Sequence, residues 1–288
     1  MLGEAFYKQF ISDYELRCTD IDLNEQWLSY LDFRDYKNYR DDVINFKPDY
    51  LFHLGAYTDL EYCELHAEDT YKTNTQSVKH AVKIANEINI PILFISTAGI
   101  FNGEKLFYDE SDIPQPLGVY AKSKYLAENY IQENSSSYLI CRAGWMMGGG
   151  PKKDKKFINK LMMQIANGKD ELFVVNDKLG TPTYTHDFSY NVKLLIKKQK
   201  IGLYNMVCQG ATSRFEVACE LINQLGLNNV VKITEVGSNF FKKEYFSPRP
   251  NSERLINAKL NNEGLNIMQD WKISLSHYLK TAYPDYID

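Results

Sequence analysis

The stretch Pro91-Ile-Leu-Phe-Ile-Ser-Thr-Ala-Gly-Ile-Phe-Asn-Gly103 is a short apolar run that passes into a polar loop containing glycine. Such a run is typical of a buried parallel strand, which delivers the residues at its end to the carboxyl edge of a sheet. The hydroxyl groups of Ser96 and Thr97 fall at that edge. The stretch therefore predicts an α/β fold with a doubly wound parallel sheet and a site at the end of this strand.

Tyr120 and Lys124 follow in the segment Pro116-Leu-Gly-Val-Tyr-Ala-Lys-Ser-Lys-Tyr-Leu-Ala-Glu128. Positions i and i+4 share one face of a helix, so the phenol and the ammonium can point into one cleft. A neighbouring cation lowers the pKa of a tyrosine below its usual value of about 10, and such a pair can pass protons. The same spacing also fits an ordinary exposed helix face, and the strand-end hydroxyl upstream favours the catalytic interpretation.

In this order, Thr97, Tyr120 and Lys124 resemble the catalytic set of the short-chain dehydrogenase/reductase superfamily. Nearly the whole chain is similar to its extended, sugar-nucleotide branch, and most similar to the dTDP-4-dehydrorhamnose reductases. The motifs that carry this resemblance are Ser96-Thr97, Ile100-Phe-Asn-Gly103, Tyr108-x-Glu110, Pro116-Leu-x-Val-Tyr120, Ser123-Lys124, Glu128, Arg142-Ala-Gly-Trp145, Val174 to Thr183 with Asp187, Pro248-Arg-Pro-x-Ser252 and Asp270-Trp271.

The resemblance implies a Rossmann-type dinucleotide-binding domain with an interleaved, smaller α/β substrate lobe. We expect the first at residues 1–145 with about 177–200, and the second at 146–176 and 201–288. The implied activity is NAD(P)H-dependent reduction of the 4-keto group of a nucleotide-linked deoxysugar. Tyr120 would be the acid, Lys124 would lower its pKa and hold the nicotinamide ribose, and Thr97 would hydrogen-bond the substrate oxygen.

Residues 2–10 have the pattern of a helix, which in the family follows a first strand and a glycine-rich turn that holds the cofactor pyrophosphate. Met1-Leu2-Gly3 is similar to the end of that fingerprint, so Gly3 would be its last glycine. We therefore expect the natural coding sequence to begin upstream of Met1. The alternative is that the protein has lost dinucleotide binding.

Further cofactor contacts are expected after the next strands. Tyr14 to Asp22 predicts a strand ending in acids, and Asp20 or Asp22 on the ribose hydroxyls would favour NAD over NADP, although aspartates also close strands as turn formers. The resemblance places Asp32 and Phe33 at the adenine. It also places the residues after the strand from Tyr50 along the dinucleotide, where Tyr57 could equally be a half-buried loop aromatic. The candidates after the strand from Tyr50 are Leu54, Gly55, Ala56 and Tyr57.

On the substrate side, the resemblance points to Trp145 against the sugar nucleotide and Arg249 on a phosphate, although a tryptophan fits a core equally well. The family usually has Asp-Tyr after the threonine, whereas this chain has Ala98-Gly99, which leaves the identity of the sugar open. Two alternatives remain. One is a nucleotide-sugar epimerase, and the other is a non-catalytic cofactor-binding subunit similar to the regulatory subunit of methionine adenosyltransferase.

Composition limits the remaining possibilities. The 288 residues are 44% hydrophobic with a net charge of −4, which gives no basic field for nucleic acid. The five cysteines show no metal-binding or redox spacing, so we expect no metal site and a reducing compartment. The sequence has no membrane-spanning run and no signal-peptide pattern. We therefore expect a cytoplasmic enzyme, with a homodimer as the assembly left open.

Overall fold

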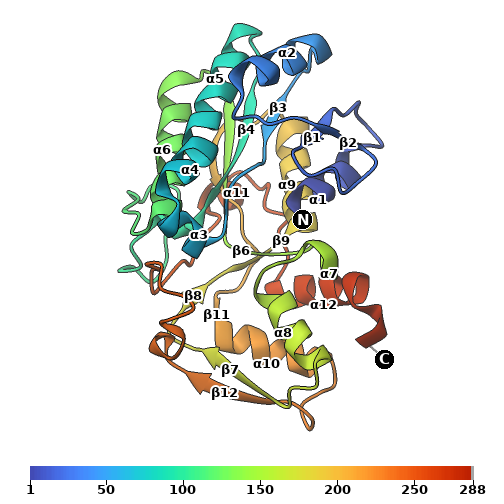
Figure 1. Ribbon diagram of the computed structural model, residues 1–288, viewed down its shortest axis with the longest axis vertical. Coiled ribbons are helices and arrows are strands. Elements are labelled where there is room, and N and C mark those ends of the chain that lie inside the picture. Colours follow the sequence, from blue (N-terminus) through green and yellow to red (C-terminus); the bar gives the residue numbers. More distant parts are fainter. Residues whose placement is uncertain (287–288) are drawn as a thin grey trace.

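Four parallel strands form the central sheet in the computed structural model, which describes residues 1–286 (Figure 1). Strands β4 and β5 lie at its centre and pair in register from Ile92 opposite Tyr138 to Thr97 opposite Ala143. Thr97 therefore ends its strand at the carboxyl edge, as expected. In sheet order the strands are β10 (Gly202–Asn205), β5 (Tyr138–Ala143), β4 (Ile92–Thr97) and β3 (Leu51–His53).

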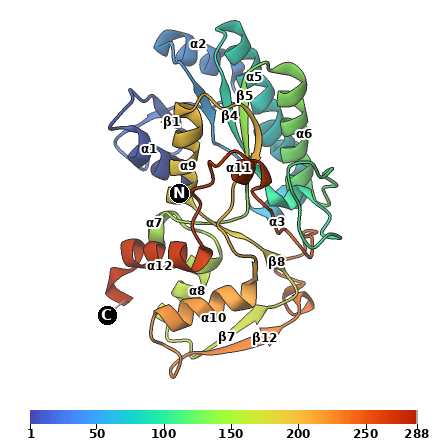
Figure 2. The same ribbon diagram turned by 180° about the vertical axis from the view of Figure 1, so that it is seen from behind.

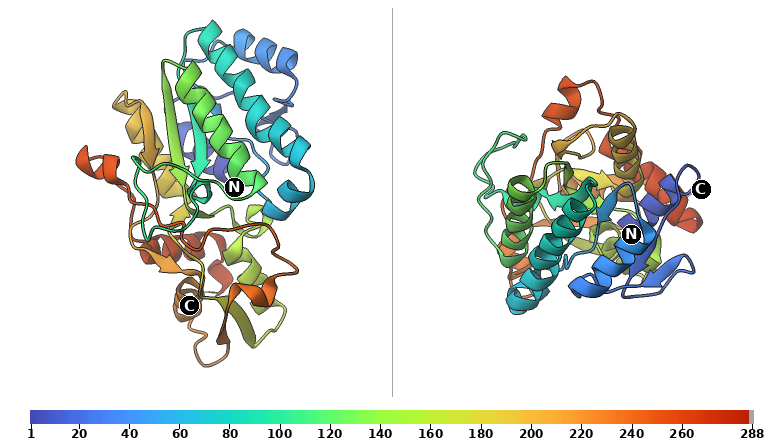
Figure 3. Two further views of the ribbon diagram at one scale, coloured as in Figure 1. Left: turned by 90° about the vertical axis from the view of Figure 1, so that its left-hand side faces the viewer. Right: turned by 90° about the horizontal axis from the view of Figure 1, so that it is seen from above.

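Successive side chains of β4 enter two different cores, because neighbouring residues of a strand point to opposite faces. Leu93 and Ile95 pack with α1 (Leu2–Phe10) and α9 (Thr185–Lys197). Ile92 and Phe94 pack on the other face with helices that include α5. Figure 3 shows the strands between the two helical layers. On the second face lie α2 (Tyr36–Phe46), α5 (Ser77–Glu87) and α6 (Val119–Asn134).

The pattern of residues 61–87 predicts one long helix, and the structure differs. The chain leaves helical geometry at His66, which has φ −127° and ψ 55°. It then passes through a π-helical turn that precedes α5, and such turns occur often at functional sites. This turn carries Asn74. The segment consists of α3 (Leu60–Leu65), α4 (Ala67–Tyr71), the π-turn η1 (Lys72–Gln76) and α5.

A separate pair of parallel strands follows α1, formed by β1 (Cys18–Asp20) and β2 (Leu28–Tyr30). The strand expected from Tyr14 is thus shorter, and it ends at Asp20. Within residues 1–286 neither strand of this pair is hydrogen-bonded to β3. The expected additional strand and glycine turn stay a prediction.

The second lobe consists of small strand pairs and helices below the main sheet in Figure 1, and Figure 2 shows α10 lying over one pair. The pairs are β6 (Trp145–Met147) with β9 (Pro182–Tyr184), β8 (Leu179–Gly180) with β11 (Thr212–Ser213), and β7 (Glu171–Val175) with β12 (Lys232–Val236). The remaining elements are α7 (Gly150–Lys153), α8 (Phe157–Ala166), α10 (Arg214–Gln224), α11 (Ala258–Asn262), α12 (Trp271–Ala282) and the 3₁₀ turns η2 (Ala98–Ile100), η3 (Ser238–Phe241) and η4 (Pro284–Tyr286).

The expected domain boundaries need two corrections, at residues 177 and 201. Strands β8 and β9 fall in the stretch assigned to the dinucleotide-binding domain, yet they pair with β11 and β6 outside the main sheet. Strand β10 falls in the stretch assigned to the substrate lobe, yet it pairs with β5 in the main sheet. Pairing with the edge of the main sheet decides the position of β10, because Tyr204 and Asn205 are buried there.

Among the described residues, no helix combines the length and apolar character needed to cross a bilayer.

Candidate active site

Thr97 and Tyr120 lie together at the carboxyl edge of the sheet. The Thr97 Oγ1 accepts a hydrogen bond from Gly99 N–H at 3.1 Å, which begins the 3₁₀ turn after β4. Tyr120 is in the first turn of α6. Burial raises the pKa of the Tyr120 phenol, and a hydrogen bond with the Thr97 side chain opposes that rise. The structure thus brings the two expected groups into contact.

The start of α6 is held by a carboxylate from α3. Gly118 is its N-cap and has no side chain to cap the helix, so Glu64 Oε1 accepts from the Val119 N–H at 2.7 Å instead. A Cβ on Gly118 would lie only 2.6 Å from that oxygen. Glycine therefore allows a negative group to approach the positive end of the helix dipole, which fixes the turn that carries Tyr120.

Lys124 is buried beside these residues, with 4% of its surface exposed. Its Nζ lies 4.0 Å from the centre of the Phe94 ring, and no hydrogen bond or ion pair within residues 1–286 includes it. Burial lowers the pKa of Lys124 to about 7, and the charge of Glu128 opposes this. Burial is the largest influence on the pKa of Tyr120 and raises it, and the lowering of this pKa by Lys124 stays a prediction.

Asn74 connects the loop after β3 to α6. Its Oδ1 accepts a hydrogen bond from the Tyr57 N–H, and its Nδ2 donates to the Tyr57 carbonyl. The same Nδ2 also donates to Ser123 Oγ at 3.1 Å. Ser123 Oγ in turn donates to the Tyr120 carbonyl at 2.7 Å. One chain of hydrogen bonds therefore joins the expected cofactor loop to the helix of the proton donor.

The expected cofactor residues follow β1, β2 and β3, but several engage one another. The Phe33 ring covers Gly55, where a Cβ would come within 2.2 Å of the ring, so this glycine accommodates an aromatic side chain. Asp32 forms an ion pair with Arg34 at 2.7 Å. Asp20 and Asp22 are exposed, Leu54, Ala56 and Tyr57 are partly exposed, and Gly3 opens to free space at the start of α1.

His53 is a structural residue. It is buried between Tyr39, whose hydroxyl lies 3.2 Å from Nδ1, and Ser77, whose hydroxyl lies 3.1 Å from Nε2. Burial lowers the pKa of His53 to about 3, so the ring is neutral near pH 7. Residues 1–286 contain no group of three or more His, Cys, Asp or Glu suited to a metal ion.

The second lobe contributes an aromatic and a carboxylate. Trp145 Nε1 donates to Glu253 Oε2 at 2.6 Å, and the Arg214 guanidinium lies 3.8 Å from the centre of the Trp145 ring. Arg214 also faces Phe157, at 4.9 Å, and burial lowers its pKa to about 10. No ion pair within residues 1–286 includes Arg214. A cation held only by aromatic faces remains available to an anion.

The other expected substrate residues are Arg249, which is already ion-paired, and Ala98, which is buried. Arg249 forms an ion pair with Glu61 at 2.8 Å and donates to the Ser247 carbonyl at 2.9 Å. Ala98 is buried in the 3₁₀ turn. Sequence reasoning missed Glu253 and Arg214. Glu253 directly follows the motif Pro248-Arg-Pro-x-Ser252, which could have pointed to it. The position of Arg214 after a helix N-cap does not indicate a functional residue.

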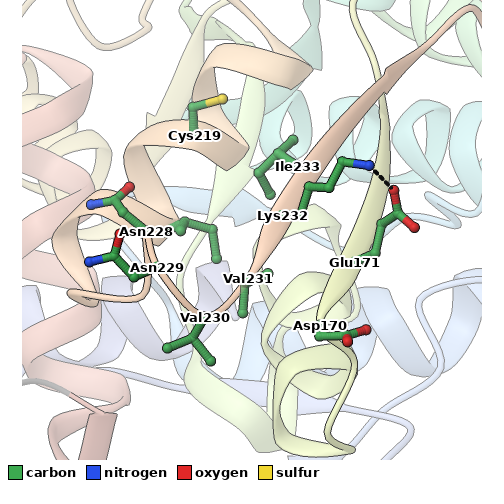
Figure 4. A pocket seen from close by; sticks show the side chains of 10 residues that line it. Asp170, Glu171, Cys219, Asn228, Asn229, Val230, Val231, Lys232 and Ile233 are labelled. Atoms are coloured by element: carbon green, nitrogen blue, oxygen red, sulfur yellow. Dashed lines mark hydrogen bonds and ion pairs between the residues drawn. The ribbon is translucent and has the colours of Figure 1, made fainter.

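A surface pocket lies away from these residues, in the second lobe between the end of α10 and the pair β7–β12 (Figure 4). Its polar groups include Asn228 and Asn229, and Lys232 forms an ion pair across it with Glu171 at 2.8 Å. It contains none of the expected catalytic groups.

Comparison with known proteins gives one family. The model of the family described as the RmlD substrate binding domain matches residues 1–283. The dTDP-4-dehydrorhamnose reductase of Escherichia coli K12 is 26% identical over 265 residues, which cover 88% of this chain and 86% of that protein.

Solved structures agree with the fold. The dTDP-4-dehydrorhamnose reductase of Yersinia enterocolitica is 28% identical and superposes with a TM-score of 0.85 over 98% of this chain and 96% of its own. That of Bacillus anthracis, solved in complex with NADP, has a TM-score of 0.86 at 23% identity over 97% of this chain and 95% of its own. The Rossmann-type architecture expected from the sequence is thus confirmed.

Proposed function

The chain belongs to the family of the RmlD substrate binding domain, and from this premise we propose that it reduces the 4-keto group of a nucleotide-linked deoxysugar with NAD(P)H. One observation carries the proposal most directly. Thr97 and Tyr120 meet at the carboxyl edge of the sheet, with the buried Lys124 one turn further along the same helix. This is the arrangement of a site that hydrogen-bonds a carbonyl oxygen and protonates it.

Tyr120 supplies the proton in this proposal. Burial raises the pKa of its phenol, so the hydroxyl is protonated at neutral pH and can donate to the substrate oxygen. Thr97 Oγ1 accepts a hydrogen bond from the Gly99 N–H, so its own hydrogen, which meets Tyr120 here, can be donated to the substrate oxygen instead. As negative charge develops on the oxygen, both donors stabilise it.

The reduced nicotinamide, when bound, supplies the hydride that reaches the carbonyl carbon. Lys124 fits the ribose of such a cofactor, because its buried Nζ has three donors and no hydrogen-bond partner within residues 1–286. Ligand hydroxyls would satisfy it and favour its charged form. That charge would then lower the pKa of Tyr120 as the phenolate forms.

The cofactor would extend from Lys124 along the residues that follow the strands. Leu54 to Tyr57 would line this path after β3, and Asn74 hydrogen-bonds the backbone of Tyr57. Asp20, Asp22, Asp32 and Phe33 would lie at the adenosine end, and Gly3 at the pyrophosphate. Arg34, paired with Asp32, adds a cation at this end.

For the substrate, we assign Trp145 to the sugar nucleotide and Arg214 to its diphosphate. Arg214 is the better phosphate ligand of the two arginines, because Arg249 is already neutralised by Glu61. Burial, and to a smaller extent the nearby Arg249, lowers the pKa of Arg214, so Arg249 would border the diphosphate site without binding the phosphate itself.

The test is incubation of the protein with dTDP-4-dehydrorhamnose and either NADPH or NADH, following both nicotinamide oxidation and the sugar product. We expect stoichiometric oxidation of the cofactor and formation of dTDP-rhamnose. Formation of an epimer without net cofactor oxidation would replace the proposal with an epimerase. Tight cofactor binding without turnover of any 4-keto sugar nucleotide would replace it with a binding subunit.

A further inference from the structure

Glu253 brings a carboxylate into the active site from a loop far along the chain. Its backbone is fixed on one side by a hydrogen bond from its N–H to the Leu179 carbonyl at 2.8 Å. On the other side, the carbonyl of the next residue accepts from the Tyr108 N–H at 2.9 Å. The loop is therefore held between β8 and the segment that follows β4.

The two carboxylate oxygens of Glu253 have different environments. Oε2 accepts the hydrogen bond from Trp145 Nε1 at 2.6 Å. Oε1 faces Gly99, and a Cβ built on that glycine would lie 3.1 Å from Oε1 and 3.5 Å from Thr97 Oγ1. Oε1 and Thr97 Oγ1 therefore border the place that a side chain at residue 99 would occupy.

Arg214 and Lys178 lie near Glu253, and the charge of Glu253 opposes the burial that lowers the pKa of each cation. The negative charge of Glu253 acts on Tyr120, because it contributes to the raised pKa of the phenol. Glu253 is half-buried, and a ligand hydroxyl that reaches Oε1 can replace water as its hydrogen-bond donor. Oε1 accepts hydrogen bonds and repels other acceptors and anions.

We propose that Glu253 determines sugar specificity: its Oε1 accepts a hydrogen bond from a free hydroxyl on the carbon next to the keto group. This inference rests on the proposed function, because it places the keto carbon beside Thr97 and Tyr120. A sugar with an ether or a carboxylate at that position leaves Oε1 unpaired or facing another acceptor. Such sugars are selected against.

The test compares Glu253→Gln with the unaltered protein. In the variant, the amide oxygen keeps the hydrogen bond from Trp145, so the amide nitrogen turns toward Gly99 and presents a donor in place of an acceptor. Two probes are used, dTDP-rhamnose and its 3-O-methyl ether, with binding measured by calorimetry in the presence of NADP. Turnover of the corresponding 4-keto compounds is measured in parallel.

We expect the unaltered protein to prefer the free hydroxyl by about 10- to 100-fold, the range for one hydrogen bond to a charged group. In Glu253→Gln this preference should fall to about threefold or less, mainly through weaker binding of the hydroxyl compound. Glu244→Gln is the matched control, because Glu244 is exposed on the same C-terminal part of the second lobe. It should keep the full preference.

An undiminished preference in Glu253→Gln, with unfolding by urea unchanged, would overturn the assignment. An equal loss in Glu244→Gln would overturn it as well. If hydroxyl-selective binding depends on Glu253 but no 4-keto compound is reduced, the proposed reaction fails while the role of Glu253 is supported. The two failures are therefore distinguishable.

Discussion

Asn74 hydrogen-bonds both backbone polar groups of Tyr57: its Oδ1 accepts from the N–H at 2.8 Å and its Nδ2 donates to the carbonyl at 2.9 Å. Asn74 is 1% exposed and also donates to Ser123. The backbone of Tyr57, just after β3, is thus satisfied by a side chain rather than by a neighbouring strand. The loop that would hold the cofactor and the helix that carries Tyr120 are joined at this residue.

Asn74→Leu should lower the free energy of unfolding by about 2 to 4 kcal/mol. The substitution preserves size but leaves the two backbone groups of Tyr57 unpaired, at about 1 to 3 kcal/mol each when buried. Urea denaturation measures the change, with the exposed Asn239→Ala as control. A loss below about 1 kcal/mol would show that Tyr57 does not depend on this side chain.

Tyr120→Phe should reduce kcat by about 10²- to 10⁴-fold, the range for a positioned general acid, while cofactor binding survives. The ring keeps its packing and only the proton donor is removed. Steady-state kinetics with calorimetric cofactor titration measure both effects. Tyr125→Phe on the same helix is the control and should retain turnover, and near-normal turnover in Tyr120→Phe would remove this residue from the mechanism.

Lys124→Met should stabilise the cofactor-free protein near pH 7 by an amount that shrinks as the pH rises toward 10. Burial lowers the pKa of Lys124 from 10.5 to about 7 in the folded state. Between these values the unfolded chain binds more protons, so the unaltered protein becomes more stable with rising pH, by at most about 1.4 kcal/mol per unit. The variant lacks this slope.

Denaturation of both proteins at several pH values between 7 and 10 checks this prediction. Lys122→Met on the exposed side of the same helix is the control. A stability difference between Lys124→Met and the unaltered protein that is constant over this range would contradict the prediction. It would mean that Lys124 finds a partner or solvent in the folded protein.

Gly180→Ala should lower kcat/KM by about tenfold or more, through displacement of Trp145. A Cβ at this position would lie 2.3 Å from two atoms of the indole, which must move together with its hydrogen bond to Glu253. A displaced contact of this kind costs roughly 1 to 3 kcal/mol. Gly237→Ala is the control, because its Cβ would meet only Asp177, at 3.7 Å. Equal activity of both variants would show that Trp145 is not positioned by Gly180.

Local patterns predicted much of this molecule. The apolar pattern of residues 157–166 predicts a helix, which is α8. Ser213 precedes an amphipathic pattern as an N-cap, and it caps α10 in a capping box with Glu216. These elements depend on residues only a few positions apart, which a sequence displays directly. The prediction of one long helix from residue 61 was wrong at His66, because the apolar period of the sequence continues across the break in the structure.

The sequence by itself determined the parallel sheet, the strand end at Thr97 and the helix face of Tyr120 and Lys124, because each depends on a strand or helix period. Only the tertiary structure decided which groups complete the site. Glu253 reaches Trp145 across 108 residues, and the Arg214 guanidinium lies over the rings of Trp145 and Phe157. Such contacts depend on how two lobes pack, and packing of segments far apart in the chain leaves no period in the sequence.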